Sequence, residues 1–361
     1  MRRLAWRAVA AAAIATIAAL HLLLYALNWP SRRAHAPRSS ARCLLAMRSS
    51  LSSHHILVLN VDERSRDPSS SVERMLAFQA SAKCPSWMHL PQTWQSRATV
   101  TTCGPSLPDG PRCAHVAPGW FPTDYVGLFV VVLAMLPPAL LHGGVPRLLI
   151  LGNGGGVLAQ LIARVLPSAI VDAVEPDEAV IRLGTLYFGS AAKCEVGWTS
   201  RACVHHADGR VFVRRRPADA PLYDLVFLDA FAWFEEQETA DASDAMVPPA
   251  WRARKWCSEL RRVLRPSTGV LAANLWEADE GTRSMRRRCD SRFGGGSRLV
   301  LDAGPGQTVE AWSMRGSDAA RSRASLARAA RGLDLPPGVV DLGAMAERAW
   351  RSSAALPARE P

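Results

Sequence analysis

The stretch from Arg147 to Asp177, RLLILGNGGGVLAQLIARVLPSAIVDAVEPD, decides how the rest of the chain is interpreted. Its apolar start, Leu148 to Leu151, has the length and composition of a strand buried on both faces of a parallel sheet. The glycine-rich segment Gly152–Gly156 follows, and Val157 to Val165 has the hydrophobic periodicity of a helix. The order strand, glycine turn, helix is typical of a nucleotide-binding unit.

A second apolar segment, Ile170 to Val174, predicts another strand, which ends in Glu175. Glu175 lies 23 residues after Gly152, close to the spacing of about 20 expected for an acid that binds a ribose diol. Glycines let the backbone turn sharply and approach a ligand closely. The stretch therefore predicts a site for a nucleoside-type ligand.

The alternation of strands and helices continues after Glu175 and predicts an α/β fold, with a doubly wound, mostly parallel sheet of seven strands. The further strands are expected over residues 202–206, 223–228, 269–275, 299–302 and 308–314, and the further helices over 177–188, 248–264 and 279–292. The last two strands are close enough to form a hairpin, which makes one strand antiparallel. An apolar helix from Thr123 to Leu141, capped at Thr123 or Asp124, should end or kink at Pro137-Pro138.

A small antiparallel β-sheet is expected before this domain, with strands over residues 55–61 and 74–78. Residues 80–120, rich in Cys, Pro, Thr and Trp, predict irregular loops. Two C-terminal helices are expected over 318–331 and 342–350. The expected organisation is a targeting segment (1–30), a disordered basic linker (31–53), a β-rich subdomain (54–122), the α/β domain (123–316) and a helical tail (317–361).

The net charge of +11 comes mainly from the N-terminal segment, because residues 1–61 hold eight arginines and no acid. The folded remainder carries only +3, so we expect no nucleic-acid-binding surface. The apolar run Ala8–Trp29 has 22 residues, close to the roughly 20 that span a bilayer. We favour a single-pass anchor in an endomembrane, while a plastid or mitochondrial transit peptide and a cleaved signal peptide remain alternatives.

Eight cysteines allow a disulfide set if the domain faces an oxidising compartment, and free buried thiols are the alternative. The spacings of Cys103 to Cys113 and of Cys194 to Cys203 would permit local bridges. No cysteines have the close spacing of a zinc site, so no metal site is expected.

Four predicted strands end in glycines or acids, and the carboxyl ends of parallel strands meet at one edge of a sheet. These ends are Gly152–Gly156, Glu175, Asp208-Gly209 and Asp229. An aspartate in such a place can also serve only as a helix N-cap. The absence of a Gly-Lys-Ser/Thr motif excludes a phosphate loop of the ATP-binding kind. Val157 stands where a dinucleotide-binding turn has its third glycine, which argues against such a ligand.

Four motifs resemble the spermidine synthase-like branch of the S-adenosylmethionine-dependent methyltransferase superfamily, and the resemblance runs from about residue 54 to residue 314. The motifs are LILGNGGG (149–156), AVEPD (173–177), HADGR (206–210) and YDLVFLDAF (223–231). The resemblance implies a cofactor site made of Gly152, Asn153, Gly154, Gly155, Gly156, Glu175, Asp208, Gly209 and Asp229. Within it, the glycine turn would face the methionine part, Glu175 would bind the ribose, and Asp208 would bind the adenine amino group. Asp229 would stand beside the reacting centre.

Two departures from the spermidine synthases favour methyl transfer over aminopropyl transfer. Those enzymes carry an aspartate where this chain has Gly155, and an Asp-Pro pair where it has Ala232 and Trp233. Both missing acids hold or activate amines. The chain is more similar to eukaryotic methyltransferase-like relatives, which share the Gly-Gly-Gly turn and the pair Asn274-Leu275. Aminopropyl transfer from decarboxylated S-adenosylmethionine and a non-catalytic binding role remain alternatives.

The segment after Asp229 suits a cationic substrate, because five acids occur between residues 235 and 244. Trp233, Glu235 and Glu236 are candidate substrate residues together with Tyr125, although a charge run can also be a hydrated surface. We expect an amine acceptor, either a protein lysine or N-terminus or a polyamine, with Asp229 as the catalytic carboxylate. A homodimer is a further expectation for this chain.

Overall fold

The structure is a computed structural model in which a mostly parallel sheet with helices on both faces is preceded by a small antiparallel sheet. The residues that it describes are 41–51, 54–61, 72–79, 94–102, 114–116, 125–194, 201–230, 255–277, 280–293, 298–304, 306–314, 322–333 and 341–351. The apolar run expected to be a membrane anchor lies outside these residues. In the part of the chain that is described, no helix is long and apolar enough to cross a membrane.

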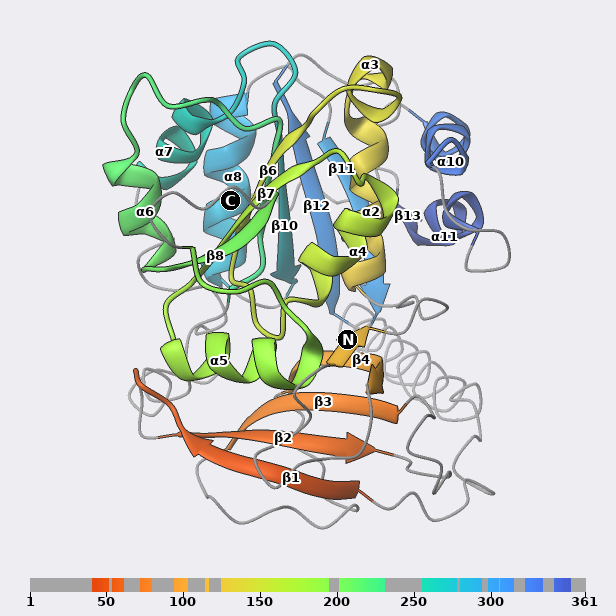
Figure 1. The fold of residues 1–361 in the computed structure, drawn as a ribbon. Coiled ribbons are helices and arrows are strands. Elements are labelled where there is room, and N and C mark those ends of the chain that lie inside the picture. The colour runs from red at the N-terminus through yellow and green to blue at the C-terminus, as the bar shows by residue number, and fades with distance from the viewer. Residues whose placement is uncertain are drawn as a thin grey trace, which may run out of the picture. The chain divides into compact units, whose positions relative to one another are not determined.

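The larger sheet has eight strands in the order β13-β11-β12-β10-β9-β6-β7-β8 (Figure 1). The bounds of its parallel strands are β6 Arg147–Leu151, β7 Ile170–Glu175, β8 Ala202–His206, β9 Leu225–Leu228 and β10 Val270–Trp276. Strand β12 (Gln307–Ser313) runs antiparallel to both β10 and β11 (Arg298–Gly304). The seven predicted strands and the terminal hairpin are therefore confirmed. A two-residue edge strand, β13 (Trp350–Arg351), pairs with β11 and was not expected.

Alternate residues of the central strands enter the cores on opposite faces of the sheet. In β6, Leu148 and Ile150 join the core under α2 and α4, whereas Leu149 and Leu151 join the core under α6, α7 and α8. Figure 1 shows these two groups of helices on opposite sides of the sheet. A strand that is buried on both faces has no polar side, which explains the uninterrupted apolar run of β6.

Helices cover both faces of the sheet. Their bounds are α2 Tyr125–Val132, α3 Pro138–Leu141, α4 Val157–Val165, α5 Glu178–Leu183, α6 Gly209–Arg215, α7 Trp256–Val263, α8 Glu280–Phe293, α10 Arg323–Arg331 and α11 Leu342–Ala349. All eight residues of α2 are buried, and a 3-10 turn, η2 (Leu133–Met135), ends it before Pro137 as expected. Helix α5 continues into a π-helical turn, η3 (Gly184–Phe188).

The smaller sheet has five antiparallel strands in sequence order. They are β1 Ala41–Arg48, β2 His55–Val61, β3 Val72–Gln79, β4 Trp94–Thr102 and β5 Ala114–Val116. The hairpin of β2 and β3 is confirmed. The prediction of a disordered linker up to residue 53 was wrong for β1, where the Arg- and Ser-rich flanks obscured the apolar run from Cys43 to Met47.

The prediction of irregular loops over residues 80–120 was wrong for β4 and β5. Strand β4 does alternate, because Ser96, Ala98 and Val100 are buried while Arg97 is exposed. Its inward side chains are small or polar, so the alternation has little hydrophobic contrast. The expected helix N-cap at residues 123–124 lies outside the described part of the chain, as do the expected first turns of α7 from residue 248.

Candidate functional site

The carboxyl ends of five neighbouring parallel strands form the edge of the sheet where the expected site residues lie. Strands β10, β9, β6, β7 and β8 are adjacent in that order. The glycine turn follows β6, Glu175 ends β7, and Asp229 directly follows β9. The backbone of this edge is tied together, because the N–H of Gly152 donates to Val174 O (2.9 Å) and the N–H of Asp229 donates to Leu151 O (2.8 Å).

Three residues of the turn have a positive φ, which favours glycine: +95° at Gly152, +49° at Gly154 and +73° at Gly156. A Cβ on Gly152 would also lie 2.2 Å from the backbone oxygen of Asp229. A Cβ on Gly156 would lie 2.1 Å from Oγ of Ser190. The turn therefore has a backbone conformation and a close packing that no other residue type fits.

The side chain of Glu175 stabilises this turn through hydrogen bonds with its backbone. Its Oε2 accepts from the backbone N–H groups of Asn153 and Gly154, each at 3.1 Å, and its Oε1 accepts from the N–H of Asp177 at 3.2 Å. Only 6% of the residue is exposed. Burial raises the pKa of the Glu175 carboxyl to about 7, although the backbone donors work in the opposite direction. The sequence had indicated a ribose ligand, and the structure adds a second role, which is to fix the turn.

Asp229 belongs to a chain of polar side chains that crosses three strands. Nδ2 of Asn274, in β10, donates to Oδ1 of Asp229 at 3.1 Å. Nε2 of Gln307, the first residue of β12, donates to Oδ1 of Asn274 at 2.8 Å. Asn274 is 6% exposed. Gln307 was missed from the sequence because it contacts Asp229 only through Asn274, and because its role depends on the antiparallel register of β10 and β12.

Asp208 and Gly209 stand at the start of α6, after β8. Oδ1 of Asp208 accepts from the backbone N–H of Val211 at 2.8 Å, so its side chain is the N-cap of that helix. Asp208 is exposed, and a Cβ on Gly209 would meet the side chain of Leu151 at ordinary contact distance, 3.5 Å. The N-cap role that the sequence left open is thus present. Adenine recognition by Asp208 stays a prediction.

Tyr125 is the first residue of α2 and is buried rather than open to solvent. Its ring meets that of Phe129 edge to face at a centroid distance of 6.0 Å, and Phe129 meets Phe227 in the same way at 5.2 Å. Phe227 lies in β9, two residues before Asp229. The aromatic row thus connects Tyr125 to the strand that carries Asp229. Trp233, Glu235 and Glu236 lie outside the described residues.

Hydrogen bonds from the smaller sheet and from the two serines after β1 reach the segments around the glycine turn, and none was expected from the sequence. Oγ of Ser96, in β4, accepts from the N–H of Gly155 at 2.7 Å. Oγ of Ser50 donates to the Asp177 carboxylate at 2.7 Å, and Ser49 donates to its other oxygen. Nη1 of the buried Arg74, in β3, donates to the carbonyl of Tyr187 at 2.7 Å. The smaller sheet is therefore hydrogen-bonded to the segments that surround the glycine turn.

Comparison with known proteins gives two curated relatives with different activities. Over 159 residues the chain is 28% identical to a polyamine aminopropyltransferase of Vibrio vulnificus (strain CMCP6), covering 44% of this chain and 47% of the relative. Over 154 residues it is 30% identical to the eEF1A lysine and N-terminal methyltransferase of Bos taurus, covering 42% of this chain and 20% of the relative. The matched part is thus less than half of either relative. No family model matches the chain.

A solved structure agrees on the fold over most of the chain. The probable spermidine synthase of Corynebacterium glutamicum ATCC 13032 superposes with a TM-score of 0.52 at 15% identity, covering 83% of this chain and 90% of that one. The chain is a relative of the spermidine synthase-like branch of the S-adenosylmethionine-dependent methyltransferase superfamily. The resemblance that the sequence motifs indicated is confirmed.

Within this spermidine synthase-like branch, the position of Gly155 is the informative departure. Its φ is not positive, so an L-residue would not be strained by its backbone. The space is crowded instead, because a Cβ on Gly155 would lie 3.0 Å from Cβ of Ser96 and 3.2 Å from Cγ of Phe188. The chain thus places a hydroxyl from the smaller sheet where the resemblance implies an aspartate in spermidine synthases. The other departure, at Ala232 and Trp233, lies outside the described residues.

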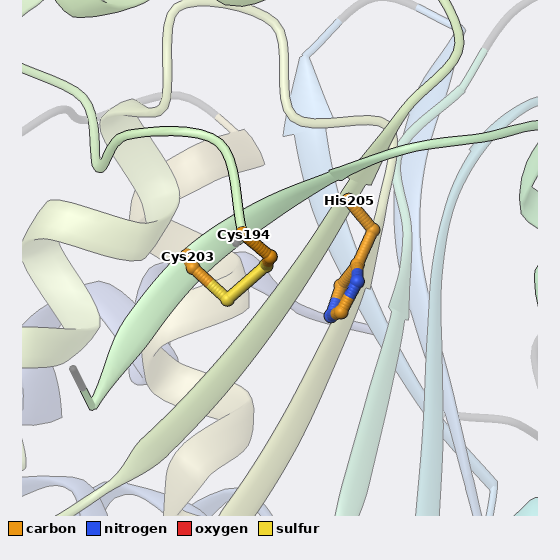
Figure 2. Close-up of side chains that lie close together, drawn as sticks. All are labelled: Cys194, Cys203 and His205. Carbon is orange, nitrogen blue, oxygen red and sulfur yellow. A yellow bond between two sulfur atoms is a disulfide. The ribbon is translucent and has the colours of Figure 1, made fainter. Parts of the chain in front are cut away.

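Two disulfides occur in the described part of this spermidine synthase-like domain, Cys194–Cys203 and Cys257–Cys289. The first is one of the local bridges that the sequence permitted. The sulfur atoms of Cys194 and Cys203 and the ring of His205 have donor atoms within 4.8 Å of one another, which is the spacing of a metal site (Figure 2). The sulfurs are joined to each other, however, so they are not thiolates. Nε2 of His205 lies 3.1 Å from Oδ1 of Asp172, so this cluster is a disulfide beside a histidine–aspartate pair.

Proposed function

We propose that this chain is an S-adenosylmethionine-dependent methyltransferase that acts on an amine. The glycine turn, the acid at the end of β7 and the carboxylate after β9 support this proposal, as does the similarity to a protein named a lysine and N-terminal methyltransferase. The residues fit such a cofactor, because four of the five residues of the turn are glycines, the side chain of Asn153 is buried, and Glu175 binds the backbone of the turn. The proposed acceptors are a protein lysine, a protein N-terminus or a polyamine.

When bound, S-adenosylmethionine supplies a methyl group activated by a positively charged sulfur, so the protein mainly has to position the acceptor. In this proposal the backbone of Gly152–Gly156 would hold the methionine part. Glu175 would accept hydrogen bonds from the ribose, and Asp208 would accept one from the adenine amino group. Asp229 orients the acceptor amine and takes its proton, because an amine must be neutral to act as a nucleophile.

The main observation that favours methyl transfer over aminopropyl transfer is the glycine at residue 155, in a tightly packed place where the resemblance implies an aspartate in spermidine synthases. Both S-adenosylmethionine and its decarboxylated form carry an ammonium group, but only S-adenosylmethionine also carries a carboxylate, which an acid at this position would repel. A side chain at residue 155 would crowd Ser96 and Phe188, which would have to move by a few tenths of an ångström, and Oγ of Ser96 already binds the backbone N–H. With glycine at residue 155, the carboxylate of S-adenosylmethionine would meet no acid from this position.

The alternative, a polyamine aminopropyltransferase that uses decarboxylated S-adenosylmethionine, is supported by the similarity to the Vibrio vulnificus relative and by the fold. Equilibrium binding of S-adenosylmethionine, its decarboxylated form and methylthioadenosine to the full chain separates these proposals. We expect S-adenosylmethionine to bind at least about tenfold more tightly than the decarboxylated form, since a difference of 1.4 kcal/mol is enough for that ratio. The reverse order would favour the aminopropyltransferase, and no binding would favour a non-catalytic role.

The acceptor and the location are proposed on sequence alone. The acids between residues 235 and 244 would attract a cationic acceptor, as negatively charged segments concentrate cations nearby. The apolar run Ala8–Trp29 would anchor the chain in a membrane, with an organellar transit peptide as the alternative. A fluorescent fusion combined with protease protection of intact organelles tests both the location and the side of the membrane on which the domain lies.

A further inference from the structure

Gln307, Asn274 and Asp229 form a hydrogen-bonded row whose direction is fixed by chemistry. A carboxylate can only accept, so the side chain of Asn274 must present its NH2 group to Asp229. The carbonyl oxygen of Asn274 then faces away from Asp229 and needs a donor. Nε2 of Gln307 is that donor, at 2.8 Å, and Nδ2 of Asn274 is 3.1 Å from Oδ1 of Asp229.

The strand register explains why these three side chains meet. Ala273 of β10 pairs in parallel with Leu228, so the next residues along the two strands, Asn274 and Asp229, are neighbours. Asn274 pairs with Val309 of β12, which places Gln307 two residues further along the same face. The row thus runs across the carboxyl ends of β9 and β10 to the start of β12.

We propose that Gln307 is a positioning residue: it donates to the carbonyl oxygen of Asn274, strengthens the amide orientation that Asp229 requires, and so holds the Asp229 carboxylate toward the reacting centre. Without a donor at residue 307, the Asn274 amide could turn by 180° and present its oxygen to Asp229. Two oxygens that only accept would then face each other, and the carboxylate would be displaced. This inference rests on the proposed function, because it assumes that the sulfonium of the cofactor lies beside Asp229.

The variants that test this row are Gln307→Glu, Gln307→Leu and Asn274→Leu. Gln307→Glu replaces the donor by an acceptor and should turn the Asn274 amide, whereas Gln307→Leu only removes the donor. The measured quantity is the ratio of the affinities of the full chain for S-adenosylmethionine, with its positive sulfur, and S-adenosylhomocysteine, which is neutral there. We expect Gln307→Glu to lower the relative affinity for S-adenosylmethionine by about fivefold to tenfold, and Gln307→Leu by less.

The double variant Asn274→Leu/Gln307→Glu separates a positioning role from a structural one. If Gln307 acts through Asn274, the double variant should have the same affinity ratio as Asn274→Leu alone. A matched control is Asp302→Ala on the same hairpin, where Oδ1 of Asp302 accepts from the N–H of Gly304 at 2.9 Å. This control should lower thermal stability and leave the affinity ratio unchanged.

A second measurement does not depend on ligand binding. In ¹⁵N-edited NMR spectra of the ligand-free protein, the side-chain amide signals of Asn274, identified by their loss in Asn274→Leu, should shift in both Gln307→Glu and Asp229→Asn. The inference is overturned if these signals do not move, or if Gln307→Glu still lowers the affinity ratio in the Asn274→Leu background. Failure of the wild-type chain to bind either ligand would instead overturn the proposed function, while the NMR result would still decide the inference.

Discussion

The carboxyl group of Glu175 is buried and accepts three hydrogen bonds from backbone N–H groups. Its pKa of about 7 in the folded chain is above the ordinary value of 4.5. Between these two values the folded state binds more protons than the unfolded state. The contribution of Glu175 to the free energy of unfolding therefore decreases as the pH rises from about 4.5 to about 7, and protonation of this side chain stabilises the fold.

The first prediction concerns this pH dependence. Glu175→Gln keeps the shape and removes the titration, so the wild type should lose roughly 2–4 kcal/mol relative to this variant between pH 4.5 and pH 7.5. Urea denaturation at several pH values measures the difference. The control is Glu178→Gln, three residues along the chain, because Glu178 is exposed and pairs with Lys193 at 3.3 Å. Parallel pH curves for the wild type and Glu175→Gln would contradict the prediction.

Strand β4 contributes to the site through Ser96, whose hydroxyl accepts a hydrogen bond from the glycine turn. Because Gly155 does not have a positive φ, the obstacle to a side chain there is space alone. That space is shared by a side chain from the smaller sheet and Phe188 of the π-helical turn η3. The identity of residue 155 and the position of β4 are therefore coupled.

The second prediction follows from this coupling. Gly155→Asp should lower the free energy of unfolding by about 2 kcal/mol or more, since it both crowds Ser96 and buries a charge. Adding Ser96→Gly removes the nearest contact and should restore part of the stability. Chemical denaturation of the two single variants and the double variant gives the coupling energy. Strictly additive effects would show that the two residues do not compete for this space.

The elements of the α/β domain were largely predictable from the sequence, because a strand such as β6 is apolar on both faces and its helix α4 has a clear period. The smaller sheet was not. Strand β4 has small or polar inward side chains, and strand β1 has flanks rich in Arg and Ser. The hydrophobic pattern of both strands is therefore weak. The π-helical turn η3 was also unforeseen, since its backbone depends on packing against Gly154 and on Arg74 from the smaller sheet.

At the scale of the whole molecule, the two disulfides found among the described residues close loops of very different length. Cys194–Cys203 closes a short loop beside β8, and Cys257–Cys289 joins α7 to α8 across 32 residues of sequence. Cys257 and Cys289 are both buried in the core under these helices. A disulfide stabilises mainly by restricting the unfolded chain, and more so when the closed loop is longer.

The third prediction is that the Cys257→Ala/Cys289→Ala variant loses about 3 kcal/mol of unfolding free energy. Cys194→Ala/Cys203→Ala, with a separation of only 9 residues, should lose less. Guanidinium denaturation with and without dithiothreitol checks both, because the reductant should have no further effect on a bridge that has been removed. A wild type that is insensitive to dithiothreitol after full unfolding would contradict this account.

At the same scale, the sequence predicted which strand ends converge but not how the site is closed. Glu175, Asp229 and the glycine turn were found because each follows an apolar strand. Gln307 and Ser96 were not found. Gln307 reaches the site through the pairing of β12 with β10, and Ser96 reaches it because the smaller sheet packs against the glycine turn. Such contacts depend on register and on the docking of one sheet against another, neither of which leaves a local pattern.

The buried acid under the glycine turn also has a calorimetric consequence for the proposed function. Ribose hydroxyls donate hydrogen bonds and so favour a carboxylate over a carboxylic acid. Near neutral pH, where Glu175 is partly protonated in the free chain, the binding of a nucleoside would expel a fraction of a proton into the solution. The heat of binding would then depend on the ionisation enthalpy of the buffer, so that heats measured in phosphate and in Tris would differ even where the affinity is the same.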